Sequence, residues 1–540
     1  YLVRCKNAAD EIQNAGQIKS ITIHMKSIKQ IISTVKNPNW VAVVLTLILP
    51  LLFCKMVLAQ VNRVAPDTSA MPDFHYEKAP CLFDATGLAP KRLECGWLTV
   101  PENRKKNNGH TIRLAVAVYT APHSSQTPVL FLAGGPGLRT VSPEILQLWS
   151  HVFRNRSIII FDQRGTGYSK PSLCPWAAST ERYIESLNLT TREFLHMKSG
   201  YVLGCHAELV SKGIDLNAYN VIENAADVND LRKALGYTKW NITGLSYGGM
   251  LAQAVIRDYP QGVRSAILIS PAPLDEFGVA LEHNVTSFAR SLNLVFKHCK
   301  HQKACISAYP NLQQRFKNTM HSLQDRPLTI SLDTMIAGQS PFIVNTRDFV
   351  QLVQNMLYSE HGIVSLPGVI MAFNKRDKDA IRNILTAWGH DLTGPGEGTS
   401  DGMFRSDVCY DAPQSKSNWE KLASAHPDLR SIGFLGDACS YWESAHATSA
   451  ELKPVKSKIP VLVYSGDLDP FVPPRFIRQI LNGLPNAKHI TYPDGTHIPD
   501  IRHNCLDHLF NAFLTNPSAP LDMSCVSKLS PLTFKVTGKQ

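Results

Sequence analysis

Residues 240–249, WNITGLSYGG, constrain the fold of this chain more than any other stretch. An apolar run ends there in a turn of small residues, with Ser246 at its centre and a glycine two positions to either side. Such a pattern has chemical meaning where a strand turns sharply into a helix, because the strained turn exposes the serine hydroxyl. The flanks fit this context, since residues 239–243 are predicted to form a buried strand and residues 250–256 a helix.

Strand-like and helix-like segments alternate on both sides of this turn. The signal Asn-Asn-Gly at residues 107–109 separates two strand-like runs and predicts an antiparallel pair at one edge of a sheet. An apolar stripe at helical spacing predicts a helix over 222–235. The alternation implies an α/β fold, with a mostly parallel sheet flanked by helices. The other expected strands are 94–100, 111–119, 129–132, 157–161, 265–269, 460–465 and 489–492.

The pattern changes in the middle of the chain. Residues 271–455 are mostly helical in pattern, with irregular loops and a Gly/Pro/Ser-rich stretch at 393–400. We expect residues 60–270 to form the N-terminal part of the core and residues 456–540 its C-terminal part. Residues 271–455 are then a large, mainly helical cap, inserted before the last core strands.

The first 59 residues have the pattern of an upstream segment and a secretory signal. Three lysines precede the apolar run 41–53, and Val-x-Ala follows it. The run is shorter than the ~20 residues that a bilayer span needs. We expect translation to start at Met25 and cleavage to follow Ala59, so that the exported protein has no stable membrane insertion. An uncleaved anchor is the alternative.

Ten cysteines follow Ala59, and an even number in an exported chain indicates disulfides. A metal site is disfavoured because no Cys-x-x-Cys occurs and no histidine lies at ligand spacing from two of the cysteines. We expect no metal and no organic cofactor. The cysteines fall into five close couples, and we expect each to pair with its neighbour: Cys81 with Cys95, Cys174 with Cys205, Cys299 with Cys305, Cys409 with Cys439, and Cys505 with Cys525.

A serine hydroxyl becomes an effective nucleophile only when a base takes its proton and a third group orients that base. Where the serine lies on a strand-turn-helix, the acid and the histidine come later in the chain in that order, each after a strand. Asp469 follows the strand expected at 460–465, and His497 follows the strand expected at 489–492. We therefore expect Ser246, Asp469 and His497 to form a catalytic triad.

Neighbouring residues compete for two of these roles. Asp467 lies close to Asp469, but Asp469 fits a Gly-x-x-Asp-x-x-x-Pro turn, and we expect Asp467 to cap that turn. His489 lies at the start of its expected strand, which is the wrong end for the site, whereas His497 lies in the loop after it.

The charge that develops on the substrate oxygen needs preorganised donors. We expect one donor to be the backbone N–H of Tyr247. The second is expected from the loop after strand 129–132, where Gly134 and Gly135 let the backbone approach the substrate. A phosphate-binding loop is the alternative, but this loop lacks the Lys-Ser/Thr ending of a P-loop and the spacing of a dinucleotide fingerprint.

The charge of the chain does not indicate a nucleic-acid partner. The net charge is +11, but the first 59 residues hold seven Lys/Arg against two acids. The remainder carries a net charge of +6, which is too mild and too scattered for nucleic acid. We expect Asp162 and Arg164 to form an ion pair that braces the loops beside the site.

Several motifs together suggest a family. They are Gly-Gly-Pro-Gly at 134–137, DQRGTGYS at 162–169, GLSYGG at 244–249, Asp469 and His497. With these motifs the chain resembles the prolyl iminopeptidase and tripeptidyl aminopeptidase family of α/β-hydrolases, over roughly residues 80 to 530. Cys-Tyr-Asp at 409–411, Cys439 with Trp442, and the closing Cys505 and Cys525 resemble the C-terminal portion (about 405–530) of the secreted tripeptidyl aminopeptidase branch.

The resemblance implies an α/β-hydrolase fold and a secreted serine exopeptidase that removes short pieces from free peptide N-termini. Ala133 stands where prolyl iminopeptidases usually have histidine, which favours the tripeptidyl branch. The closing motif is Gly-Thr-His rather than Gly-His-Gly, a variant that keeps the histidine.

An aminopeptidase must bind an α-ammonium group, so an acid of the cap is expected to face Ser246. Asp411 is the candidate because it lies beside a cysteine of the shared motif, and Glu443 is the second choice. Asp275 and Glu276 compete with them.

Two other readings remain open at this stage. A carboxylesterase or lipase would use the same triad, since the cap alone determines which acyl group the enzyme accepts. An inactive binding protein on this fold is the non-enzymatic alternative, but it would not require Ser246, Asp469 and His497 all to be intact. The sequence leaves the oligomeric state undetermined.

Overall fold

The structure is a computed structural model that describes residues 74–106, 108–122, 126–275, 284–332, 341–388, 399–411, 438–499 and 504–536. The chain divides into two compact units, Tyr1–Ala70 and Met71–Gln540, and the described residues all belong to the second. The expected signal segment, with Met25 and the cleavage point after Ala59, lies outside the described residues.

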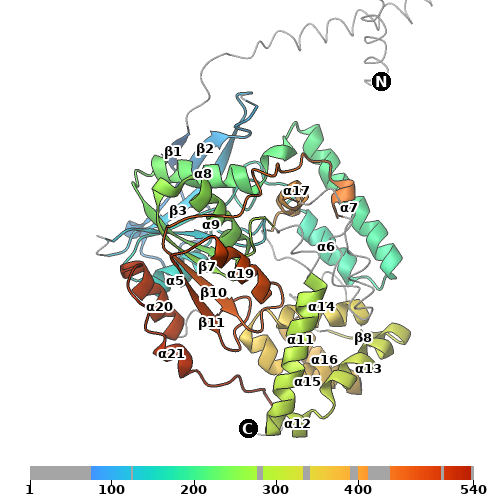
Figure 1. Cartoon of the computed structure of the whole chain (residues 1–540). Helices are drawn as coiled ribbons and strands as arrows, with labels where there is room; N and C mark the ends of the chain where they lie inside the picture. Colours follow the sequence, from blue (N-terminus) through green and yellow to red (C-terminus); the bar gives the residue numbers. More distant parts are fainter. Residues whose placement is uncertain are drawn as a thin grey trace, which may run out of the picture. The chain divides into compact units, whose positions relative to one another are not determined.

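A nine-stranded sheet forms the centre of the second unit (Figure 1). Its strand order is β1-β2-β3-β5-β4-β6-β7-β10-β11. The first three pairings along this order are antiparallel and the remaining five are parallel. The parallel part agrees with the alternating pattern, and β2 with β3 is the expected antiparallel pair. Strand β1 and the antiparallel pairing of β3 with β5 were not predicted. The strands are β1 (His75–Lys78), β2 (Leu93–Pro101), β3 (Thr111–Tyr119), β4 (Val129–Leu132), β5 (Ile158–Phe161), β6 (Trp240–Leu245), β7 (Val263–Ile269), β10 (Val461–Gly466) and β11 (Ala487–Tyr492).

Helices cover both faces of this sheet. On one face α8 (Val221–Ala234), α9 (Tyr247–Asp258) and α19 (Pro474–Asn482) pack against the strands, and together they bury one apolar cluster. On the other face α5 (Pro143–Val152) and α20 (Asn504–Thr515) bury a second cluster. The strands β4, β5 and β10 are buried along their whole length, because both of their faces are covered.

The register brings the carboxyl ends of the inner strands to one edge. Leu132 at the end of β4 pairs with Gly244 of β6, and Leu245 pairs with Ile269 at the end of β7. Gly466 at the end of β10 pairs with Tyr492 at the end of β11. The loops that follow these strands therefore meet at one edge of the sheet, where open α/β sheets bind their ligands.

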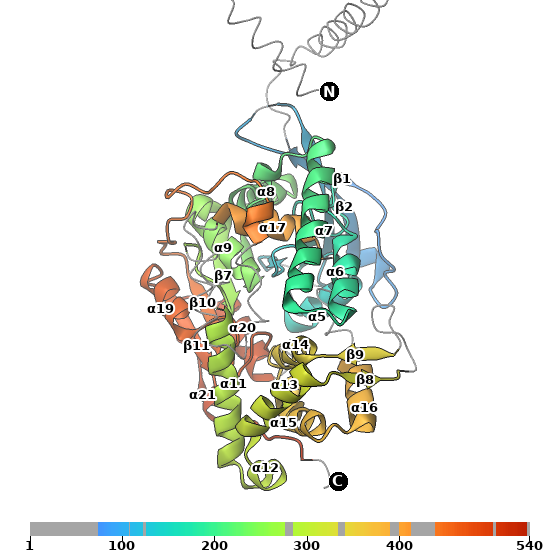
Figure 2. The ribbon, with the colours of Figure 1, turned by 90° about the vertical axis from the view of Figure 1, so that its right-hand side faces the viewer.

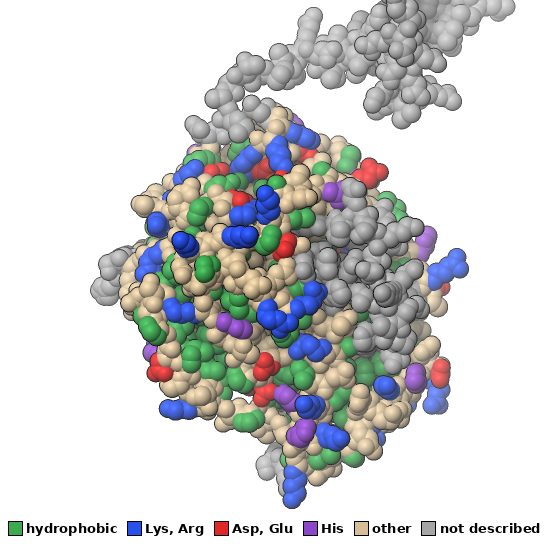
Figure 3. All heavy atoms as spheres, viewed as in Figure 1, with side chains coloured by type: hydrophobic (Ala, Val, Ile, Leu, Met, Phe, Trp, Pro, Cys, Tyr) green, Lys and Arg blue, Asp and Glu red, His purple; other side chains and the backbone are tan. Residues whose placement is uncertain are grey.

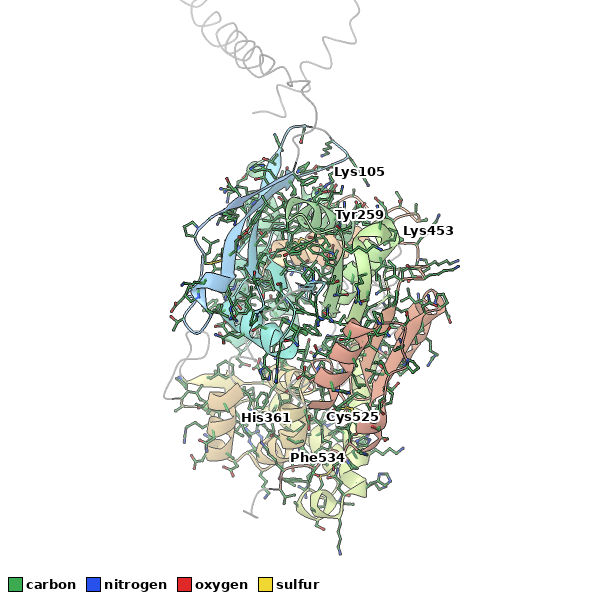
Figure 4. The ribbon with its side chains drawn as sticks, turned by 90° about the vertical axis from the view of Figure 1, so that its left-hand side faces the viewer. Lys105, Tyr259, His361, Lys453, Cys525 and Phe534 are labelled. Carbon is green, nitrogen blue, oxygen red and sulfur yellow. A yellow bond between two sulfur atoms is a disulfide. The ribbon has the colours of Figure 1, made fainter. Side chains whose placement is uncertain are left out.

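The cap, as we call the chain between β7 and β10, has an apolar core of its own. The C-terminal segment returns to it, since Leu532 and Phe534 are buried in the same core, and Figures 2 and 4 show this part of the chain. The cap elements are α11 (Asn284–His301), α12 (Lys303–Ala308), α13 (Leu312–Asp325), β8 (Leu328–Ile330), β9 (Phe342–Val344), α14 (Thr346–Met356), α15 (Glu360–Lys375), α16 (Lys378–Trp388), α17 (Asp401–Asp411) and the short η6 (Ala438–Tyr441).

Two more helices, which the sequence analysis did not predict, join the cap. They are α6 (Ala177–Ser186) and α7 (Thr191–Ser211), inserted between β5 and α8. Their apolar residues form a cluster with Met403 of α17 and with Trp442. In Figures 1 and 2, α17 lies between α7 and α8. The helical cover over the sheet therefore comes from two separate parts of the chain.

The ten cysteines form the five neighbouring pairs that the sequence analysis expects. The pair Cys174–Cys205 joins the start of α6 to α7, and the pair Cys409–Cys439 joins α17 to η6. Each disulfide therefore closes a loop inside one region of the fold. None of the helices among the described residues is long and apolar enough to cross a membrane.

Candidate active site

Ser246 lies at the sharp turn between β6 and α9. Its backbone has φ 56° and ψ −120°, a strained conformation for a residue with a side chain. A Cβ atom at Gly244 would collide with the carbonyl of Gly248, and one at Gly248 would collide with the carbonyl of Leu132. The two glycines therefore allow the close approach that the turn requires.

His497 and Asp469 form a hydrogen-bonded pair at the same edge of the sheet. The Nδ1 atom of His497 lies 3.0 Å from each carboxylate oxygen of Asp469. The carboxylate also accepts the backbone N–H groups of Phe471 (2.8 Å) and Val472 (2.9 Å), which fix its orientation. Asp469 is fully buried and His497 is 6% exposed, so the pair is shielded from water. Asp467 is exposed.

The cap helix α11 holds the loop that carries Asp469. Arg290 donates hydrogen bonds to the carbonyl oxygens of Asp467 (2.9 Å) and Asp469 (2.5 Å). The hydroxyl of Ser291 donates to the carbonyl of Leu468 at 2.5 Å. Three successive carbonyls of the acid loop are thus bonded to two neighbouring residues of one helix.

The same helix also reaches the loop that carries His497. His298 lies 3.0 Å from the carboxylate of Asp494, which precedes His497 by three residues. The second carboxylate oxygen of Asp494 accepts the N–H of Leu532 at 2.9 Å. The C-terminal segment and α11 therefore fix the histidine loop from two sides.

Aromatic rings surround the imidazole of His497. Phe471 and Tyr358 present their rings edge-on to it, at centroid distances of 5.1 and 5.8 Å. Tyr358 lies between α14 and α15, and its carbonyl accepts the N–H of Ile498 at 3.1 Å. Burial and the negative charge of Asp469 raise the pKa of the Tyr358 phenol well above its usual value. The side chain of Ile498 is 48% exposed and adds an apolar surface beside the histidine.

The glycine-rich loop after β4 approaches the serine. A Cβ atom at Gly134 would lie 3.1 Å from the Cβ and 3.7 Å from the Oγ of Ser246. Gly135 and Gly137 have φ values of 109° and 100°, which only glycine adopts readily. The loop is anchored by Gln163, whose side-chain amide donates to the carbonyl of Ala133 at 3.2 Å.

The prediction of an ion pair between Asp162 and Arg164 is wrong. Arg164 pairs with Asp227 instead, through two hydrogen bonds of 2.8 Å. Asp162 accepts three backbone N–H groups, those of Thr140, Val141 and Tyr168, at 2.6 to 2.9 Å. Burial raises the pKa of Asp162 to about 6, although these N–H groups act in the opposite direction. Asp162 thus holds the end of the glycine-rich loop through backbone N–H groups, and the nearby charge of Arg139 also favours its ionised form.

A cavity of about 500 Å³ lies next to this loop. It is lined by Arg139 and Tyr168, among others, and by residues of the segment between β1 and β2. Arg139 stands over the ring of Tyr168 at 5.5 Å and follows Gly137 by two residues. None of Ser246, Asp469 and His497 lines this cavity.

Among the described residues, neither Glu443 nor Asp275 contacts Ser246. Asp411 is the last residue of α17, and its side chain is outside the described part of the structure, as is Glu276. Glu443 is exposed, and Asp275 accepts a hydrogen bond from Gln479 at 2.9 Å. The acid that would bind an α-ammonium group therefore stays a prediction.

His489 has a partner away from the proposed triad. Its Nε2 atom lies 2.8 Å from the hydroxyl of Ser465, on the neighbouring strand. Burial lowers the pKa of His489 below its usual value. Within the described ranges, no group of three or more His, Cys, Asp or Glu side chains could hold a metal ion.

The sheet order, with the strained serine turn between β6 and α9, is that of the α/β-hydrolase fold. Residues 127–328 match the family model described as alpha/beta hydrolase fold. Residues 431–525 match a second model, described as TAP-like protein. The chain is thus an α/β-hydrolase-fold protein with a TAP-like C-terminal region.

The chain is similar to three relatives that have peptidase names. The chain is 22% identical to the tripeptidyl aminopeptidase of Streptomyces coelicolor, over 82% of this chain and 84% of the relative. It is 22% identical to the serine protease Hip1 of Mycobacterium tuberculosis, over 79% of this chain and 86% of the relative. A proline iminopeptidase of Neisseria meningitidis is 30% identical, but over only 26% of this chain and 31% of the relative. The chain is a hydrolase whose relatives carry peptidase names.

Proposed function

We propose that this chain is an exported serine aminopeptidase, which releases tripeptides or proline-type residues from free peptide N-termini through an acyl-enzyme at Ser246. The observation that carries the proposal is the buried pair between His497 Nδ1 and the carboxylate of Asp469, at 3.0 Å. This pair shares one edge of the sheet with the strained serine turn. It is the arrangement that a serine nucleophile requires.

The proposed reaction has two halves. Ser246 Oγ attacks the carbonyl carbon of the scissile bond, and His497 takes the hydroxyl proton on its Nε2 atom. Asp469 holds the imidazole in the tautomer with Nδ1 protonated and stabilises its charged form. The imidazolium then protonates the leaving amine, the C–N bond breaks, and water hydrolyses the acyl-enzyme by the same steps.

The negative charge on the tetrahedral oxygen would be stabilised by backbone donors. We assign one to the N–H of Tyr247, the first residue of α9, where the helix dipole also favours negative charge. The second would come from the loop containing Gly134 and Gly135, which approaches Ser246. Without side chains these two glycines leave the space beside the serine open.

A tripeptidyl rather than a prolyl preference is supported by the extent of the similarity. The tripeptidyl aminopeptidase of Streptomyces coelicolor matches 82% of this chain and 84% of its own. The proline iminopeptidase matches about a quarter of this chain. Asp411, and after it Glu443, are our candidates for binding the substrate ammonium group. Replacing Asp411 with alanine should remove the preference for free over blocked N-termini.

Export is supported by the five disulfides of the described residues, since disulfides persist in oxidising compartments. Lys and Arg side chains are interspersed with acidic and apolar ones on the face seen in Figure 3. This mixed charge does not favour a nucleic-acid partner. We propose peptides as the partners, in the medium or the periplasm, and the proposal includes no cofactor.

One set of assays tests the proposal. The purified protein and its Ser246→Ala variant are treated with a fluorophosphonate probe and then given tripeptidyl, prolyl and short-chain ester substrates. Each peptide is offered with a free and with a blocked N-terminus. We expect labelling of the wild type alone and hydrolysis of free tripeptidyl substrates.

The other outcomes separate the alternatives. Hydrolysis of esters alone would favour a carboxylesterase or lipase, which can use the same triad. Absence of labelling would favour an inactive binding protein. Equal hydrolysis of free and blocked peptides would contradict the aminopeptidase assignment but keep the serine hydrolase.

A further inference from the structure

Helix α17 belongs to the cap, yet it and the residue before it contact Tyr247 and the glycine-rich loop, which contain the proposed oxyanion donors. Ser400, the residue before this helix, donates its N–H to the carbonyl of Gly137 at 2.8 Å. A Cβ atom at Gly137 would lie 2.5 Å from the carbonyl oxygen of Ser400, so the two segments are in close contact. The hydroxyl of Ser400 donates to the carbonyl of Leu173 at 2.8 Å and accepts the N–H of Met403 at 3.1 Å. The start of α17 therefore fixes the end of the glycine-rich loop.

Two turns further along the helix, Asp407 reaches the residue that follows the serine. The phenol of Tyr247 donates a hydrogen bond to Asp407 Oδ1 at 3.0 Å and accepts one from the side-chain amide of Asn224 at 3.2 Å. Tyr247, Asp407 and Asn224 are all fully buried.

Burying a carboxyl group has a cost that an apolar pair would avoid. Burial raises the pKa of Asp407 to about 8, and its Oδ2 atom has no hydrogen-bond partner in the part of the chain that the structure describes. A Phe–Leu pair could fill similar volume without desolvating a polar group. Packing alone therefore does not explain why a carboxyl group is buried here. The contact that Asp407 makes with the phenol of Tyr247 fixes the orientation of that side chain.

We propose that Asp407 is a positioning residue, which fixes the phenol of Tyr247 and thereby aims the backbone N–H of Tyr247 at the oxyanion. The ring and the N–H belong to one residue at the first position of α9, so a shift of the ring moves the donor. Together with Ser400, Asp407 makes α17 the element that sets both halves of the oxyanion hole. This inference rests on the proposed function.

The test uses three single variants of the full chain. Asp407→Leu removes the acceptor, Tyr247→Phe removes the donor, and Asp407→Asn keeps an oxygen that accepts the phenol proton. We expect kcat to fall about 10- to 100-fold in the first two variants, with KM changed less than about threefold, because the contact acts on the transition state. Asp407→Asn should retain kcat within about threefold at pH 7. The double variant Asp407→Leu/Tyr247→Phe should lose no more than either single one, since both remove the same contact.

A matched control separates positioning from stability. Asp348 is another buried carboxylic acid of the cap, which caps α14 by accepting the N–H of Asn345 at 3.0 Å. Asp348→Leu should lower the Tm without lowering kcat per folded enzyme. If Asp407→Leu does not fold, Tyr247→Phe alone tests the inference, because it removes a single oxygen atom and leaves the ring in place.

Several results would overturn the inference. They are a kcat within about twofold of wild type in Tyr247→Phe, a loss confined to KM, an equal loss in Asp407→Asn and Asp407→Leu, and an equal loss in Asp348→Leu. All rates are taken relative to the wild type on whichever substrate it hydrolyses. A wild type that the fluorophosphonate does not label would instead overturn the proposed function, and with it this inference.

Discussion

Asp469 and Asp407 are both fully buried carboxylic acids, and the groups that surround them give them different tasks. Asp469 accepts two backbone N–H groups and faces the imidazole of His497. Asp407 faces a phenol, and burial raises its pKa to about 8. Each of them can therefore be tested by an isosteric change to asparagine, with different expected results.

For Asp469→Asn we expect kcat to fall on the order of 10³- to 10⁴-fold, because the amide leaves the proton of His497 on the wrong nitrogen. The Tm should change little, since the amide oxygen still accepts the N–H groups of Phe471 and Val472. Steady-state kinetics with a free tripeptidyl substrate measure the effect. The matched control is Asp467→Asn, two residues away and exposed, which should keep kcat within about twofold. Equal losses in the two variants would contradict the assignment of the acid.

For Asp407→Asn we expect a change in the pH dependence of stability. In the unfolded chain an aspartic acid loses its proton near pH 4, whereas folded Asp407 keeps it up to about pH 8. The folded state therefore binds more protons in this window, and the stability of the wild type falls as pH rises from 4 to 8. The asparagine variant lacks this contribution. Its Tm should rise relative to wild type across the window, by on the order of several degrees at pH 8. Parallel Tm curves would contradict the shifted pKa.

At the scale of elements, the cap contributes to the geometry of the site as well as covering it. α11 binds three carbonyls of the acid loop through Arg290 and Ser291, and α17 contacts the glycine-rich loop and Tyr247. Asp469, His497 and Ser246 lie on loops of the sheet, yet the loops are held by helices from a distant part of the sequence. Substitutions of the residues that make these contacts should therefore affect catalysis.

For Arg290→Met we expect a loss of about 1–3 kcal/mol in the free energy of unfolding, because two charge-assisted hydrogen bonds to the acid loop disappear. kcat should also fall, by about tenfold, since the loop that orients His497 is no longer held. Chemical denaturation and steady-state kinetics measure the two effects. Lys297→Met removes an exposed cation from the same helix and should alter neither quantity appreciably. An unchanged kcat in Arg290→Met would show that α11 acts on stability alone.

At the scale of the whole molecule, each of the five disulfides closes a loop within its own region of the fold. The bond Cys174–Cys205 closes a loop of 31 residues, and the bond Cys299–Cys305 closes one of 6 residues. Chain entropy predicts that the longer loop contributes more, about 3.7 against about 2.2 kcal/mol. We expect the double variant Cys174→Ala/Cys205→Ala to lose more stability than Cys299→Ala/Cys305→Ala, as measured by thermal denaturation. The reverse order would show that packing around the sulfur atoms, rather than loop closure, determines how much stability each disulfide contributes.

Two polar contacts join the segment before β10 to parts of the chain that lie far from it in the sequence. Lys105 pairs with Glu451 at 2.5 Å, which ties the loop between β2 and β3 to the segment before β10. Arg257 of α9 donates to the carbonyl of Lys453 at 3.1 Å. Figure 4 shows Lys105 and Lys453 on one side of the molecule and Phe534, from the C-terminal segment, among the cap helices.

Much of the sheet could be predicted from the sequence because its signals are local. Buried parallel strands give short apolar runs, and the ends of β4, β6 and β10 differ from the expected ends by no more than two residues.

The helix after Ser246 begins at Tyr247 rather than at residue 250, because Gly248 and Gly249 conceal its start. α6 and α7 were not predicted. Their apolar residues face a cluster that includes α17, more than 190 residues later.

The sequence by itself determined the serine turn, since only glycines at 244 and 248 permit its close contacts. It also determined the order of Ser246, Asp469 and His497 along the chain, which follows from the order of the strands. Only the tertiary structure decided that Arg164 pairs with Asp227 and that Asp407 bonds to Tyr247. A buried polar group takes whichever partner the fold brings within hydrogen-bonding distance, and that distance is not encoded in spacing along the chain.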